Sequence, residues 1–382
     1  MAEIERLKEY GFDPEAQEQA RRYQLDRLRL KIVYYAILLA LLLLFARFGS
    51  AGLADWIGGF AHGPWPLNVL YTLIFTVGLF LLGLPLDWWG YRIEQRYGLS
   101  TQSPRSWLAD ELKGGAINLI IFLIAFPAIY IGIVQSGTWW LIAWVITTMF
   151  IILMSFVAPV VLMPLFFKFE PLEDEEPAGR LKGLAERANV KIIGVFKMAA
   201  GVKTKKAVGA LAGIGATRRI ILSDTLLENY TPDEIETVIA HELGHHVHRD
   251  IWKRVAGFSA MTLIGFYTVH LALGPFARSL GLDRGIASLP LFLVILGGVF
   301  FILAPLRNTF SRWFEGEADR FALELARRPE AQARVDVKLC DQNLRYAAPH
   351  PVIEFLFYDH PAGIKRVERA LKFRNGSDAI DP

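Results

Sequence analysis

The chain has 382 residues, of which 53% are hydrophobic, and its mean hydropathy is +0.32. Soluble domains are usually less apolar, so the surplus must lie against lipid or in a very large core. A net charge of +3 is too small to indicate nucleic acid as a partner. The single cysteine, Cys340, excludes an internal disulfide framework and fits a reducing compartment.

The apolar residues form six long uncharged runs, each close to the length of about 18 residues that a bilayer core requires. We expect membrane spans at residues 32–48, 67–86, 114–134, 138–167, 257–280 and 288–306. The first run is not expected to be a secretory signal peptide, because a long charged segment precedes it. The sequence thus predicts an integral, multi-pass protein whose surroundings include the lipid bilayer.

Lys and Arg are distributed unevenly among the connections between these runs. Residues 1–31 and 87–113 contain many of them, whereas residues 135–137 contain none. Cytoplasmic connections carry an excess of Lys and Arg, so the amino-terminal segment should be cytoplasmic. An even number of spans then places the long polar segments 168–256 and 307–382 on the same side. We expect a bacterial inner membrane or the endoplasmic reticulum membrane, with the catalytic site facing the cytoplasm.

Four segments are expected along the chain. Residues 1–167 form a membrane domain with four transmembrane helices, and residues 168–256 form a catalytic domain. Residues 257–306 add two further transmembrane helices, and residues 307–382 complete the catalytic domain. The predicted fold is mainly α, a polytopic membrane helical bundle of about six spans with a zincin-type α+β catalytic domain. The acidic stretch 170–177 is expected to be a solvated linker.

The first catalytic segment contains a glycine-rich stretch, AVGALAGIGATRRIILSD, at residues 207–224. Ile220 and Leu222 alternate with polar neighbours after the glycines, which predicts a hairpin or an exposed edge strand. A flexible glycine loop is the alternative. Ala207, Val208 and Gly209 are the candidate residues of an edge that would pair with the backbone of an extended peptide substrate.

A strong helix signal follows. Thr231 and Glu234 form a T-x-x-E capping box with a proline at the first helical position. The predicted helix contains HELGH, so His241 and His245 lie one turn apart and both imidazoles can bind a single zinc ion. Glu242 is rotated by about 100° along the helix and is suited to act as a catalytic base. The alternative is a surface helix that happens to contain several histidines.

A catalytic zinc site needs a third protein ligand and keeps one position open. In RWFEGEADRFA, Glu315 and Asp319 share one helix face, whereas Glu317 points elsewhere. We predict Glu315 as the third ligand and Asp319 as a partner that orients an imidazole. A solvated helix end is the alternative. His248 is a rival ligand, but it would crowd three donors along one helix, and Asp250 is expected to support the site or to end the helix.

Six ordered blocks of the chain carry a family resemblance. They are GLSTQSPRSWLADELKG from Gly98, PLFFKFEPL from Pro164, RRIILSDTLL from Arg218, HELGHHVHRD from His241, NTFSRWFEGEADRFA from Asn308 and DHPAGIKRVER from Asp359. With these blocks, most of the chain resembles the M48 metallopeptidase family. The resemblance is strongest to its Ste24-like branch, the type I CAAX prenyl proteases of the endoplasmic reticulum membrane and their bacterial relatives.

The resemblance implies that Glu315 is the third ligand and that His360 and Arg366 lie in the site as catalytic residues. A histidine there could hydrogen-bond the oxyanion of a tetrahedral intermediate, and an arginine could orient a carboxylate or a substrate carbonyl. One departure concerns the segment before the edge strand. The family usually carries Asn-Ala-aromatic there, whereas this chain has Lys206 followed by Ala and Val, which affects a substrate contact and no proposed ligand.

The sequence therefore predicts a membrane-embedded zinc metalloendopeptidase with one Zn²⁺ per chain, which hydrolyses peptide or protein substrates, prenylated or not, in the manner of CAAX-box protein processing. One alternative is an HtpX-like quality-control protease of membrane or misfolded proteins. Another is a non-catalytic zinc-binding scaffold or sensor, but a structural zinc site has no need of Glu242. An intramembrane protease is disfavoured, because TPDEIE and HHVHRD, which flank the motif, are too polar for hydrocarbon.

Overall fold

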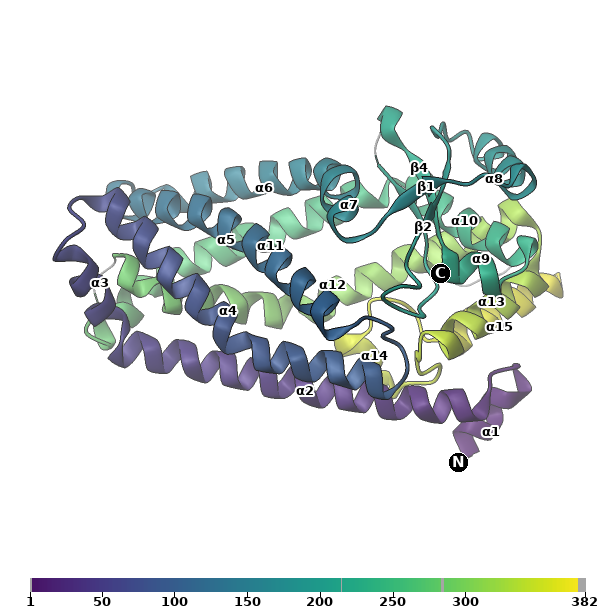
Figure 1. The fold of residues 1–382 in the computed structure, drawn as a ribbon, viewed down its shortest axis with the longest axis horizontal. Helices are drawn as coiled ribbons and strands as arrows, with labels where there is room; N and C mark the ends of the chain where they lie inside the picture. Colours follow the sequence, from purple (N-terminus) through teal and green to yellow (C-terminus); the bar gives the residue numbers. More distant parts are fainter. Residues whose placement is uncertain (1, 214, 283–284, 377–382) are drawn as a thin grey trace.

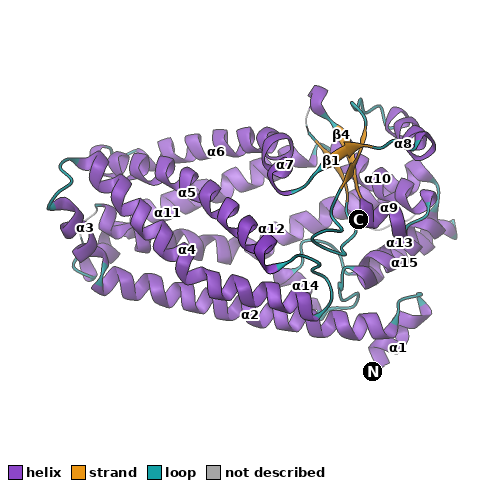
Figure 2. Ribbon diagram, in the orientation of Figure 1, coloured by secondary structure: helices purple, strands orange, loops and turns teal. Residues whose placement is uncertain are grey.

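The structure is a computed structural model that describes residues 2–213, 215–282 and 285–376. Long helices run roughly along one axis, and a smaller part with a sheet and shorter helices lies at one end of them (Figure 1). Figure 2 shows that the strands are confined to this end, while helices make up most of the rest. The fold is therefore mainly α, as predicted.

Within the described residues, six helical segments are long and apolar enough to cross a membrane, which confirms the expected number of spans. Their main helices are α2 (Pro14–Phe48), α4 (Pro64–Arg96), α5 (Pro104–Gln135), α6 (Trp139–Val157), α11 (Asp250–Ser279) and α12 (Leu289–Ala326). Proline occupies the first turn of α2, α4, α5 and α12, where its missing N–H costs no hydrogen bond. Large apolar side chains point outward, and Phe301 and Ile302 are 70% and 75% exposed, as lipid-facing positions require.

Short elements complete the bundle. Helix α1 (Ala2–Glu9) precedes α2, and α3 (Ser50–Gly58) connects α2 to α4 at the end far from the sheet. A π-helical turn (Ala158–Leu162) and α7 (Met163–Phe166) carry α6 toward the sheet. The bundle core contains the fully buried rings of Tyr71, Tyr130 and Phe292, and the Tyr130 hydroxyl lies 3.2 Å from Oγ of Ser288. The buried hydroxyl group of Tyr130 is thus hydrogen-bonded.

Helices α11 and α12 extend well beyond the apolar runs that predicted them. The expected domain boundaries at residues 256 and 306 both lie inside these continuous helices. Single helices therefore connect the membrane bundle to the part of the protein that contains the sheet, and α12 carries both the sixth span and Glu315. The position of Glu315 is consequently tied to the packing of the bundle.

The sheet has four short strands, β1 (Phe169–Pro171), β2 (Val195–Met198), β3 (Gly209–Ala212) and β4 (Arg219–Ser223). Their order is β1-β2-β4-β3, with β2 and β4 parallel and the other pairs antiparallel. Around it lie α8 (Glu175–Arg187), α9 (Asp224–Asn229), α10 (Pro232–Val247), α13 (Pro329–Gln342), α14 (Pro351–Phe357) and α15 (Gly363–Arg374). The predicted hairpin is confirmed as β3–β4, and β3 is an edge strand.

Two sequence expectations about this region differ from the structure. Strand β4 is central, and Ile221 is buried as well as Ile220 and Leu222, because separate apolar clusters cover the two faces of the sheet. The apolar residues of β4 therefore lie on both of its faces, and neither face is exposed to solvent. The acidic stretch 170–177, expected to be a solvated linker, contains the end of β1 and the start of α8.

Candidate metal centre and active site

Helix α10 presents the HELGH residues to α12. The capping box is formed as predicted, with Thr231 and Glu234 each accepting a hydrogen bond from the other's backbone N–H. Gly244 lies on the face of α10 that packs closely against α12. A Cβ atom at Gly244 would lie 3.1 Å from Cα and 3.2 Å from the carbonyl oxygen of Ala318. Glycine within the motif thus permits a close approach that brings α12 to the two histidines.

Three side chains converge between these helices. One donor atom each from His241, His245 and Glu315 lies within 4.8 Å of the others. Nε2 of His241 is 3.2 Å from Oε2 of Glu315, and Nε2 of His245 is 3.4 Å from Oε1. These are the three residues predicted as metal ligands. Two imidazoles and one carboxylate form a donor set that catalytic zinc sites use, with a fourth position left open.

Both histidines are held by carboxylates at the nitrogen that faces away from Glu315. Nδ1 of His241 lies 2.9 Å from Oδ1 of Asp319, and Nδ1 of His245 lies 2.8 Å from Oδ2 of Asp250. The Asp250 contact is a hydrogen bond, whereas the Asp319 contact has the distance of one without its geometry. A carboxylate beside Nδ1 favours the proton on that nitrogen and leaves Nε2 available to a metal. The structure thus places Asp319 and Asp250 where the sequence analysis expected supporting residues.

The charge and burial of the cluster fit a bound cation. Oε2 of Glu315 is buried and forms no hydrogen bond of good geometry within the described residues, as expected of a ligand oxygen. Burial acts to lower the pKa of His241, but the carboxylates of Asp319 and Glu315 outweigh it and raise this pKa to about 10. The cluster therefore favours positive charge at the position that a metal ion would take.

Two arginines in contact with this cluster were not predicted. Arg254, near the start of α11, donates from Nη2 to Oε1 of Glu315 at 3.1 Å and from Nη1 to Oγ of Ser311 at 3.0 Å. Arg369 donates to Oδ2 of Asp319 at 2.8 Å. Arg369 lies in the block DHPAGIKRVER, but local sequence indicates neither contact, because each joins different helices.

Arg366 holds the carboxylate that orients His241. Its Nη2 and Nε atoms lie 2.7 Å and 3.0 Å from the two oxygens of Asp319, and its Nη1 atom lies 3.1 Å from Oδ1 of Asp336. The guanidinium is therefore engaged by two buried carboxylates. Of the two roles that the sequence analysis gave Arg366, the observed contacts match the orientation of a carboxylate.

His360 approaches the cluster from the loop before α15. Its Nε2 atom is 3.5 Å from Oε2 of Glu315, and its Nδ1 atom is 2.8 Å from Oδ1 of Asp359. The ring is partly exposed, so it lies at the border between the cluster and solvent. The rival ligand His248 ends α10, packs with its ring 5.6 Å from that of Phe321, and is not among the three converging residues.

Glu242 is reached from two cavities. One has a volume of about 690 Å³ and is also lined by His245. The other has a volume of about 220 Å³ and is also lined by His241 and His360. The side chain predicted as the catalytic base therefore borders two cavities, one that also contacts His245 and one that also contacts His241.

The edge of β3 exposes fewer backbone groups than the sequence suggested. The carbonyl of Val208 accepts from the N–H of Ser223, so Val208 faces β4. Ala207 faces outward, but its N–H donates to Oδ1 of Asn343 at 3.1 Å. The alternation of antiparallel pairing then leaves the N–H and C=O groups of Gly209 and Leu211 directed outward. Of the three predicted edge residues, Gly209 is the one placed to pair with a peptide.

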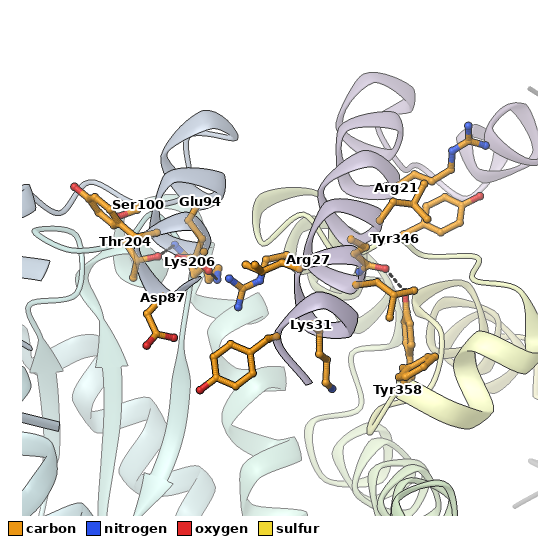
Figure 3. A pocket seen from close by; sticks show the side chains of 18 of the residues that line it. Arg21, Arg27, Lys31, Asp87, Glu94, Ser100, Thr204, Lys206, Tyr346 and Tyr358 are labelled. Atoms are coloured by element: carbon orange, nitrogen blue, oxygen red, sulfur yellow. Dashed lines mark hydrogen bonds and ion pairs between the residues drawn. The ribbon is translucent and has the colours of Figure 1, made fainter. Parts of the chain in front are cut away.

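A third cavity, of about 1210 Å³, lies beside the segment that leads into this edge. Its walls include α2, α4 and residues 346–358, and Figure 3 shows Arg27 and Lys31 of α2 on one wall and Glu94 and Lys206 across from them. The Nζ atom of Lys206 lies 3.1 Å from Oε1 of Glu94. The lysine thus joins the start of the edge segment to α4.

A bundle of membrane-spanning helices with a carboxylate-oriented His-His-Glu cluster and an adjacent glutamate defines an integral, multi-pass membrane metallopeptidase. Comparison with known families agrees with this class. Residues 5–168 match the family described as CAAX prenyl protease N-terminal, five membrane helices, and residues 171–374 match Peptidase family M48. The chain belongs to peptidase family M48 and is a metalloprotease.

Relatives of this chain occur in bacteria and eukaryotes. It is 31% identical over 330 residues to the uncharacterized metalloprotease YhfN of Bacillus subtilis, covering 83% of this chain and 77% of YhfN. It is 28% identical to a CAAX prenyl protease 1 homolog of Arabidopsis thaliana, covering 92% of this chain and 86% of that protein. The crystal structure of S. mikatae Ste24p superposes with a TM-score of 0.83 at 21% identity, over 94% of this chain and 89% of that one. The last comparison establishes a shared fold.

Proposed function

We propose that the chain is a zinc metalloendopeptidase in which His241, His245 and Glu315 hold one Zn²⁺ ion and Glu242 is the catalytic base. The orientation of both imidazoles by carboxylates, with their Nε2 atoms toward Glu315, is the observation that carries the proposal. When bound, zinc would lower the pKa of a water molecule and polarise the scissile carbonyl.

The protein's own groups supply the proton transfers and part of the charge stabilisation. Glu242 takes a proton from the attacking water and passes it to the leaving amine. Nδ1 of His360 donates to Asp359, and in the imidazolium form, with a second proton on Nε2, the ring would also donate to the oxyanion of the tetrahedral intermediate. Arg366 acts indirectly, because it holds the Asp319 carboxylate that orients His241.

The substrate is proposed to bind as an extended peptide along β3. Its backbone would pair with the outward groups of Gly209 and Leu211, and such main-chain bonds are largely independent of sequence. The outward N–H of Ala207 donates to Asn343 instead. A bound peptide therefore cannot pair with β3 beyond Gly209 on that side. A peptide held there passes Glu242, which lines the cavities on both sides.

We further propose CAAX-type processing of prenylated proteins as the reaction class. Support comes from relatives named CAAX prenyl protease 1 and from the cavity of about 1210 Å³, whose lining includes Leu28, Tyr34, Leu86 and Phe167. Pockets for small ligands usually measure about 300–1,000 Å³, so this cavity has room for an isoprenoid chain. It lies beside the proposed edge, because Lys206 lines it and Ala207 lines the small cavity at the site.

The proposed site faces the cytoplasm. Arg254 and Arg312 lie on the helix segments that lead to the metal cluster, and Arg92 and Lys113 lie near the ends of α4 and α5 on the same side of the membrane. At the other end, the turn between α5 and α6 contains no Lys or Arg. An excess of Lys and Arg is typical of cytoplasmic segments, which supports this orientation.

A test uses the detergent-purified, zinc-loaded chain and two peptides with the same CAAX terminus, one farnesylated and one not. Cleavage that is lost in Glu242→Ala and after chelation supports the metallopeptidase, and a higher kcat/KM for the farnesylated peptide supports CAAX-type processing. Equal cleavage of both peptides would instead favour a general quality-control protease. Bound zinc without cleavage of either peptide would favour a scaffold or sensor.

A further inference from the structure

The cavity of about 690 Å³ beside Glu242 has an unbalanced charge. Besides Glu242 and His245, its lining includes Arg218, His246 and Arg249. Among the described residues that line it, Glu242 is the sole acidic one. A bound zinc ion would add further positive charge on the same wall. We call this space the basic cavity.

The arginines of the basic cavity lack an ion-pair partner among the described residues. Neither Arg218 nor Arg249 forms an ion pair with any residue in the part of the chain that the structure describes. Nε of Arg218 is buried and has no hydrogen-bond partner there. An unpaired buried donor of a charged group is costly, which points to a ligand that satisfies it.

The cavity on the other side of Glu242 provides a contrast. Its two arginines are both engaged, Arg366 by Asp319 and Asp336, and Arg345 by Asp359 at 3.6 Å. Positive charge available to a ligand is therefore concentrated on one side of the catalytic base.

A peptide on the proposed edge would enter the basic cavity. Leu211, whose backbone groups face outward from β3, lines this cavity together with Glu242. At the opposite end of the edge, Asn343 occupies the outward N–H of Ala207. One end of a bound peptide must consequently pass Leu211 and approach Arg218.

We propose that the basic cavity binds a carboxylate of the substrate, on one side of the scissile bond, through Arg218 and Arg249. The carboxylate is either an Asp or Glu side chain or the carboxyl terminus of the peptide, since both present the same planar anion to a guanidinium. This subsite rests on the proposed peptidase function, and it adds a preference for acidic or carboxyl-terminal segments that the metal cluster alone does not impose.

The test measures kcat/KM for peptides that differ at a single position, with Glu, Gln or Lys at successive positions on both sides of the cleaved bond. A parallel pair differs in having a free or an amidated carboxyl terminus. We expect a preference of at least about tenfold for the carboxylate, equivalent to about 1.4 kcal/mol, on one side only. Loss on amidation identifies the terminus as the ligand, and a Glu preference that survives amidation identifies the side chain.

Substitutions of Arg218 test whether the preference for a carboxylate arises in the basic cavity. In Arg218→Ala the ratio of Glu to Gln cleavage should fall toward one, in Arg218→Glu it should shift in favour of Lys, and Arg218→Lys should retain part of it. Lys191→Ala removes an exposed cation that does not line the cavity and should leave the ratio unchanged. Because the readout is a ratio, partial misfolding of a variant lowers both rates and does not imitate the result.

Two results would overturn the subsite: equal kcat/KM for Glu, Gln and Lys at every position together with no effect of amidation, or a preference that persists in the Arg218→Ala, Arg249→Ala double variant. Binding of the same peptides to zinc-loaded Glu242→Gln, followed by fluorescence anisotropy, repeats the test without turnover. Absence of cleavage by the wild-type chain counts against the proposed peptidase function, whereas equal affinities for acidic and neutral peptides count against the subsite.

Discussion

Arg254 donates a hydrogen bond from Nη2 to Oε1 of Glu315 at 3.1 Å, so the helix that begins the fifth span holds the proposed third metal ligand. Partners of this kind orient a ligand, and their removal typically costs about 10–100-fold in metal affinity. We therefore expect Arg254→Ala to weaken zinc binding by about tenfold or more and Arg254→Lys to weaken it less. Competition with a chromophoric chelator measures the affinity.

Arg105 is the matched control for this prediction, because it is an exposed arginine on α5 outside the metal cluster. Arg105→Ala should bind zinc as the wild type does. Unchanged zinc affinity in Arg254→Ala would show that the contact with Glu315 has no role in metal binding.

Gly244 sets the spacing of α10 and α12. Gly244→Ala places a Cβ about 3.1 Å from backbone atoms of Ala318, which cannot move without shifting α12. Overpacking of this kind typically costs about 1–3 kcal/mol, and here it also moves Glu315 from the histidines. We expect a lower thermal midpoint and weaker zinc binding. Gly183→Ala in α8, where a Cβ meets nothing within 4 Å, should leave both unchanged or slightly raise the midpoint.

The edge of β3 offers a test of backbone recognition. The N–H of Leu211 faces outward, so Leu211→Pro removes a donor to the substrate and leaves the hydrogen bonds between β3 and β4 in place. One net hydrogen bond of about 0.5–1.5 kcal/mol corresponds to a decrease in kcat/KM of about 2–13-fold. Leu211→Ala, which keeps the N–H, should lose less. Equal kcat/KM values for the two variants would show that the N–H of Leu211 does not bind the substrate.

Much of the metal site follows from local sequence because its signals repeat within a helix. The capping box at Thr231 starts α10, and the spacing of four residues places His241 and His245 on one face. The same spacing places Glu315 and Asp319 on one face of α12 and Glu317 on another. These assignments need no knowledge of how distant segments pack.

The supporting contacts were not predictable, since they depend on tertiary packing. Asn343 meets Ala207 across 136 positions of the chain, and Arg254 meets Glu315 across 61. Burial of Ile221 on the second face of the sheet depends on α7, which lies elsewhere in the sequence. The charge of the basic cavity likewise arises when Arg218, which precedes β4, is brought beside α10 and Arg249.

The capping carboxylate of Glu234 gives a pH dependence of stability. It is buried and accepts from the N–H of Thr231 at 3.0 Å and from Nζ of Lys338 at 2.8 Å. Burial acts to raise the pKa of Glu234, but these hydrogen bonds outweigh it and lower the pKa below its usual value. The stabilisation is thus complete above the usual pKa of about 4.3 and is lost as the pH falls through the lower folded-state pKa.

We expect Glu234→Gln to lower the thermal midpoint at pH 7, in line with the loss of about 1–2 kcal/mol for a charged capping interaction. The difference from the wild type should shrink as the pH is lowered below about 4. Glu228→Gln, at an exposed position of α9, is the control and should change the midpoint little. A difference that stays constant between pH 7 and pH 3.5 would contradict the assignment of this effect to the ionised carboxylate.

The proposed mechanism requires Glu242 to perform the chemistry at a metal held by His241, His245 and Glu315. The most direct measurement determines bound zinc and peptide hydrolysis together in wild type, Glu242→Gln and Glu315→Gln. We predict one zinc per chain in wild type and Glu242→Gln, with hydrolysis reduced at least about 100-fold in the latter, and loss of both zinc and hydrolysis in Glu315→Gln. Hydrolysis at the wild-type rate by zinc-loaded Glu242→Gln, or unchanged zinc in Glu315→Gln, would contradict the account.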